Sequence, residues 1–230
     1  MSHQKIKSHW PVLRAMLFAT GICLLLFIVR CCMIGKVERA GIYVNIFLAW
    51  IPYIVALLID GMLDNKRTKS WVLWLLLLIW LLFLPNAAYI ITDLTHWRKD
   101  KILPVWYDWI FISAIAWVGL FLAFLSVQIL QFHIAKKHGA LHSWCFVLLA
   151  LSASSFGIYV GRFFRWNSWD ALIRQNRMFG GFEAMMEPAT QWNIASFCAA
   201  FTVFSLMVYV MLHAVSHTRL EAELASEEDK

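Results

Sequence analysis

The stretch from Trp71 to Ile91 reads WVLWLLLLIWLLFLPNAAYII and decides the class of fold. Its purely apolar part ends at Leu84 after 14 residues, which as a helix would be only about 21 Å long. A hydrocarbon core of about 30 Å needs about 20 apolar residues. We therefore expect the helix to continue through Pro85, with a kink inside the membrane. Alternatively, the chain breaks at Pro85 and Asn86 caps a short half-helix.

Five further apolar runs have the length of a membrane span: 12–34, 41–59, 109–130, 141–161 and 192–212. The first superficially resembles a signal peptide, but no small-residue cleavage site follows it, so we expect a retained span. Hydrophobic residues make up 61% of the chain and charged residues 15%, against about 45–50% and 25% in soluble domains. These features predict an all-α polytopic membrane helix bundle with about six transmembrane helices. They also predict one transmembrane domain, 1–218, followed by an acidic C-terminal tail, 219–230.

An even number of spans places both termini on one face of the membrane. Ten Lys and Arg residues lie near the span ends on that face and ten on the other, so the positive-inside rule does not fix the orientation. If Arg162 and Arg165 belong to a binding site, the remaining count favours cytoplasmic termini in a multi-pass protein of the cell membrane. The net charge of +6 fits contact with anionic headgroups of the lipid bilayer. No basic run stands on a soluble surface suited to nucleic acid.

Seven of the eight histidines fall on the face that holds the termini, and only His96 falls on the other. His213 and His217 are four residues apart, so one helix face would present both to a metal ion. No carboxylate or cysteine accompanies them nearby in the sequence. We therefore interpret them as interfacial histidines and assign no metal site.

Two polar segments fall on the face opposite the termini, one at 84–96 followed by 106–108 and the other at 157–170. They concentrate the residue types that carry chemistry: Asn86, Asp93, His96, Asp108, Arg162, Arg165, Asn167 and Asp170. Because polar groups at span ends are unremarkable singly, it is their concentration on one face that suggests a site.

The spacing within these segments suggests two functions. If the third helix continues past Pro85, Asp93 and His96 are three residues apart and share a face, where they would act as acid and base or as two metal ligands. Arg162 and Arg165 have the same spacing, and two guanidinium groups on one face suit a phosphate or carboxylate. Asn86, Asn167 and Asp170 complete the candidate ligand-binding set.

Three hypotheses stay open. In the first, the polar segments form one site for an anionic or lipid-headgroup ligand. In the second, they only hold the bundle together, with Asp93 or Asp170 paired to an arginine, and the protein is a scaffold or assembly subunit. In the third, which is less favoured, the protein transports a small solute. No Walker A, GxSxG, HExxH or GxGxxG motif is present. The residues therefore assign no reaction, substrate, cofactor, protein partner or oligomeric state.

Segments 84–94, 106–108 and 161–170 together resemble an uncharacterised group of bacterial membrane proteins, domain of unknown function 1361. The resemblance covers most of the chain, from about the second span to the sixth, and rests on the order and spacing of the three motifs. The family pattern often has a proline at the position of Ala88. The resemblance implies a polytopic bacterial membrane protein. It supplies no activity, cofactor or catalytic residue.

Overall fold

The computed structural model describes residues 3–35, 41–63, 69–92, 104–164 and 185–228, and every regular element within these ranges is helical. The elements are α1 (His3–Ile34), α2 (Gly41–Leu63), α3 (Ser70–Tyr89), α4 (Val105–His138), α5 (Ala140–Tyr159), the π-helical turn η2 (Val160–Phe164) and α8 (Pro188–Glu228). In the described part of the chain, six helices are long and apolar enough to cross a membrane. The predicted all-α polytopic bundle is confirmed.

The third span crosses Pro85 without a break. α3 contains Pro85 and ends at Tyr89, and a 3₁₀ turn extends it to Thr92. The prediction of a continuous helix is therefore confirmed, and the alternative of a chain break capped by Asn86 is wrong. The fifth helix likewise continues past Gly161, because η2 carries it to Phe164.

The last helix is longer than the predicted span of 192–212. α8 begins at Pro188 and ends at Glu228, so it includes all but the last residues of the acidic tail predicted at 219–230. That tail is rich in Ala, Glu and Leu, which are strong helix formers. The helix therefore continues after the apolar residues stop.

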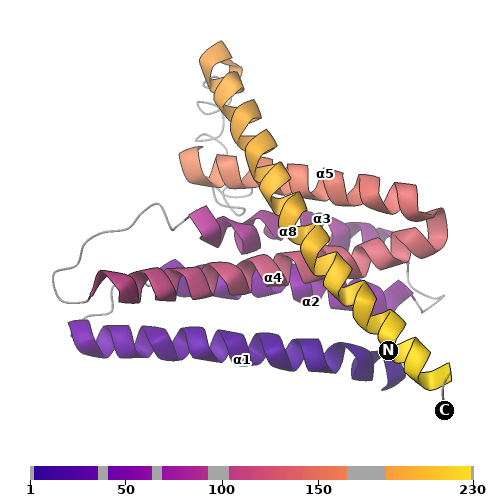
Figure 1. Ribbon diagram of the computed structural model, residues 1–230. Coiled ribbons are helices and arrows are strands. Elements are labelled where there is room, and N and C mark those ends of the chain that lie inside the picture. Colours follow the sequence, from indigo (N-terminus) through magenta and orange to yellow (C-terminus); the bar gives the residue numbers. More distant parts are fainter. Residues whose placement is uncertain (1–2, 36–40, 64–68, 93–103, 165–184, 229–230) are drawn as a thin grey trace.

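α4 is the central helix of the bundle and packs against α1, α2, α3 and α5. In its most apolar stretch 67% of the residues are buried, against 17% for α1 and for α8. α1 lies along one side of α4, and α8 crosses the bundle obliquely (Figure 1). Both termini lie at the same end of the bundle (Figure 1), as an even number of spans requires; we call it the terminal end and the other the distal end.

Short connections bring neighbouring helices into antiparallel contact. α4 ends at Gly139, whose φ of +88° lies in the left-handed region that glycine adopts without steric cost. Its N–H donates to the carbonyl of Ala135 at 2.9 Å, and α5 begins at the next residue. The chain therefore reverses within one residue, and α5 returns to the distal end.

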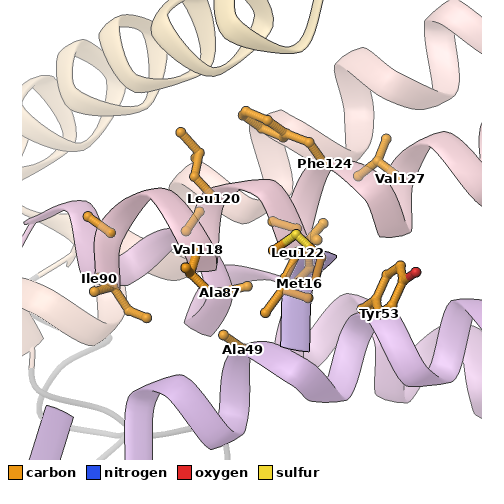
Figure 2. Close-up of a cluster of buried hydrophobic side chains, with 14 of the residues drawn as sticks. Met16, Ala49, Tyr53, Ala87, Ile90, Val118, Leu120, Leu122, Phe124 and Val127 are labelled. Atoms are coloured by element: carbon orange, nitrogen blue, oxygen red, sulfur yellow. The ribbon is translucent and has the colours of Figure 1, made fainter. Parts of the chain in front are cut away.

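Apolar side chains from all six described membrane-spanning helices form one core, to which α4 contributes most. Figure 2 shows Ala49 of α2 and Ala87 of α3 among the buried side chains of this cluster, with Ala87 near Val118 of α4. Both alanines are fully buried. Small residues at these positions let the backbones of α2, α3 and α4 approach closely, as is usual between membrane helices.

Candidate functional site

The Pro85 segment of α3 is fixed between two glycines of neighbouring helices. A Cβ atom on Gly119 of α4 would overlap the carbonyl oxygen of Ala87, and one on Gly157 of α5 would overlap the Pro85 ring. Glycine at both positions therefore allows the α3 backbone to lie against α4 and the Pro85 ring to lie against the backbone of α5. The close approach at Gly157 sets the position of the next turns of α5.

Arg162, in η2, reaches across to the end of α3. One terminal guanidinium nitrogen donates to the Thr92 carbonyl oxygen at 3.0 Å, and the other donates to the Tyr89 hydroxyl at 3.4 Å. The guanidinium carbon also lies 5.8 Å from the centre of the Tyr89 ring, within the range of a cation–π interaction. Arg162 is half-buried, so α3 holds a cation at the distal end without enclosing it.

Asn86 belongs to the same part of α3. It lies one helical turn before Tyr89 and is half-buried, and residues three apart on a helix share a face. The structure thus brings Asn86 and Arg162, two of the predicted ligand-binding residues, to the distal end where α3 and η2 meet.

The other predicted site residues lie outside the described part of the chain. They are Asp93, His96, Arg165, Asn167 and Asp170. Whether both polar segments form one site is therefore not tested, and the pairing of Asp93 or Asp170 with an arginine stays a prediction.

A family model described as a protein of unknown function, DUF1361, matches residues 44–218, which is well over half of the 230-residue chain. The chain belongs to the DUF1361 family. No curated protein and no solved structure matches it. Relative to the matched segment, α1 (His3–Ile34) is an additional helix at the N-terminal side.

A buried ion pair that we did not predict joins α1 to the DUF1361 segment at the distal end. Arg30 Nε donates to Asp108 Oδ1 at 2.8 Å, and the exposed fractions of the two residues are 0% and 3%. The neighbouring Tyr107 hydroxyl donates to the Leu26 carbonyl of α1 at 2.6 Å. In the sequence Asp108 is only one member of the polar set, and Arg30 lies within the apolar run 12–34.

A second unpredicted cluster lies at the terminal end and joins three helices. Asp60 near the end of α2 is 4% exposed. Its Oδ1 lies 2.6 Å from Nε2 of His133 on α4, and its Oδ2 lies 3.4 Å from Nε2 of His9 on α1. The sequence does contain a signal for this cluster, because Asp60 directly follows the apolar run 41–59 on the face that holds seven histidines.

The interior of α4 separates these two polar ends. Asp108 and Ser126 are 18 positions apart, about 27 Å along the helix, and every buried residue of α4 between them is apolar. Polar contacts resume only toward the terminal end, where the Trp80 indole N–H donates to Ser126 at 3.0 Å and Tyr209 donates to Gln131.

His213, one of the two histidines considered for a metal, packs against aromatic rings. Its ring centre lies 5.2 Å from that of Trp144 and 6.2 Å from that of Tyr209. The side chain of His217 lies outside the described residues. No group of three potential metal ligands that would suit an ion occurs among the side chains that the structure describes.

Proposed function

We propose that the distal end of this DUF1361 protein binds an anionic group, a phosphate or carboxylate such as that of a lipid headgroup, with Arg162 as the principal cation. The observation that carries the proposal is the fixation of Arg162 by Thr92 and Tyr89. A guanidinium oriented in advance loses little side-chain entropy when it binds an anion.

The depth of Arg162 supports the same proposal. It belongs to the last turn of a candidate membrane span, Ala140–Phe164, and the ends of a spanning helix lie near the headgroups. Asn86 supplies an amide from α3 on the same side. In this proposal Arg165, Asn167 and Asp170 complete the ligand-binding set, and Asp93 with His96 are the candidates for acid–base work.

The proposal is tested by lipid retention. The purified protein in detergent is incubated with an equimolar mixture of phosphatidic acid and phosphatidylcholine, and bound lipid is counted by native mass spectrometry. We expect a preference for phosphatidic acid that falls about tenfold in Arg162→Gln, because a hydrogen bond to a charged group contributes about 1.5–3 kcal/mol. Arg14→Gln is the matched control, since Arg14 is an exposed cation at the other end of the bundle.

Inorganic phosphate distinguishes the two sources of the anion. If the site takes a free anion, millimolar phosphate displaces phosphatidic acid from the wild type; if it takes a headgroup, phosphate does not. An equal loss of phosphatidic acid in Arg162→Gln and Arg14→Gln would overturn the proposal, because retention would then follow net charge alone.

A scaffold role is the second candidate, and one observation favours it. The hydrogen bonds of Arg162 described above both go to α3, as in a residue that only fixes two helices together. In that case Arg162→Gln lowers the melting temperature and leaves lipid retention unchanged. A transporter receives less support, because the buried residues of α4 are apolar over about 27 Å.

A further inference from the structure

The cluster of His9, Asp60 and His133 joins the only described helix that precedes the DUF1361 segment to two helices within it. His9 belongs to α1, Asp60 to α2 and His133 to α4. Neither the anion site at the distal end nor the scaffold alternative uses these residues. The cluster therefore needs an explanation of its own.

The burial of the three side chains differs in a way that suits proton uptake. The Asp60 side chain is 6% exposed, whereas those of His133 and His9 are 17% and 29% exposed. His9 begins its candidate span and His133 lies near the end of the span Val105–His138, so both imidazoles are near the water phase and are more accessible than the carboxylate. Each carboxylate oxygen faces one imidazole nitrogen, so a proton taken up by either ring lies next to a negative charge.

We propose that the His9–Asp60–His133 cluster is a proton-binding site that sets how firmly α1 is held against α2 and α4. When an imidazole takes a proton from water it becomes a cation, and its contact with the Asp60 carboxylate becomes an ion pair. Histidine is the side chain that changes charge between about pH 5 and 8. α1 is therefore held more firmly near pH 6 than near pH 8.

The neighbouring charges do not supply the same response. On the elements packed around Asp60, the other charged groups toward the terminal end whose side chains the structure describes are Arg14 of α1, Lys69 before α3, and Lys136 and Lys137 of α4. Lysine and arginine keep their charge between pH 5 and 8. The remaining described histidines at this end, His138, His142 and His213, contact aromatic or histidine rings.

The cluster would control the position of α1, because only a small part of α1 is buried against the other helices. Only 17% of its most apolar stretch is buried, and one of its buried residues, Cys23, is 2% exposed. Cys23 is a free thiol and is therefore a native probe of α1 docking. Exposed Cys145 on α5 is an internal reference, since any effect of pH on thiol labelling in general acts on both residues.

The test is the rate at which a membrane-permeant maleimide labels Cys23 relative to Cys145 in the full-length protein, measured by mass spectrometry at pH 6 and pH 8. In the wild type we expect the ratio to rise about three- to tenfold from pH 6 to pH 8. His133→Gln and His9→Gln should raise the ratio at pH 6 and reduce its pH dependence. His142→Gln, which removes an exposed histidine outside the cluster, should behave as the wild type.

The pH dependence separates proton binding from simple packing. If His133→Gln and His9→Gln loosen α1 equally at both pH values and the change between pH 6 and 8 persists, the proposal is wrong. It is also wrong if the wild-type ratio does not change with pH. Asp60→Asn should give a ratio independent of pH; should this variant fail to fold, the two histidine variants still decide the matter.

Discussion

The two ends of the bundle hold α1 by different kinds of charge. At the distal end, Arg30 of α1 pairs with Asp108. At the terminal end, His9 of α1 and His133 of α4 meet at Asp60. Arginine is always charged, whereas histidine changes its charge near neutral pH. Under the proposal above, we therefore expect the terminal attachment to respond to pH more strongly than the distal one.

Breaking the distal pair should have the largest effect on stability. Arg30→Met leaves the Asp108 carboxylate buried without its partner, which typically destabilises a protein by about 3–5 kcal/mol. We expect a large fall in melting temperature, or loss of folded protein, when the purified variant is heated in detergent and its tryptophan fluorescence is followed.

The double variant Arg30→Met with Asp108→Leu is the control for this experiment. Replacing both members of a buried pair by apolar residues is often neutral or stabilising, so most of the lost stability should return. If the double variant is as unstable as Arg30→Met, the packing of the arginine matters more than its charge and the comparison between the two ends loses its basis.

Adding a methyl group where α3 and α4 are in direct contact should have the next largest effect on stability. In Gly119→Ala the new methyl group would overlap the carbonyl oxygen of Ala87, a backbone atom that cannot rotate away. Overpacking of this kind costs about 1–3 kcal/mol, measured as a lower melting temperature. In Gly21→Ala the methyl group meets nothing within 4 Å, and alanine favours a helix more than glycine does, so this control should lose no stability. A similar loss in both variants would show that the contact with Ala87 is not responsible.

Much of the fold follows from the sequence alone, and α3 shows why. The hydrocarbon core sets a minimum length for a span, so an apolar run that stops at Leu84 has to continue through Pro85, and it does. The contact of Gly119 with Ala87 could not be predicted in this way. The two residues are 32 positions apart in the chain, and their contact depends on which faces of α3 and α4 meet. Six apolar helices have many possible pairings.

The candidate site was predicted less completely, for a related reason. The count of spans places Arg30 and Asp108 at the same end, yet it says nothing of the distance between them, and they are 78 positions apart in the sequence. Among the described residues, Arg162 contacts a tyrosine hydroxyl and a backbone carbonyl, and charge alone predicts neither partner. The charge pattern of the sequence shows at which end of the bundle a charged residue lies, whereas the packing of the helices determines which residue it contacts.

Weakening the terminal attachment should have the smallest effect, and its dependence on pH should distinguish it from the other two. The His133 contact with Asp60 is shorter and less exposed than the His9 contact, so His133→Gln should cost about 1 kcal/mol and His9→Gln about half as much. Both losses should be larger at pH 6 than at pH 8, because the pairs gain their charge as the imidazoles bind protons. Melting temperatures of the wild type and both variants at the two pH values measure this difference. The double variant Arg30→Met with Asp108→Leu leaves no buried carboxylate behind, so its effect on the melting temperature should be the same at both pH values. An effect of this double variant that changes with pH as much as that of His133→Gln would mean that the two ends are not independent attachments of α1.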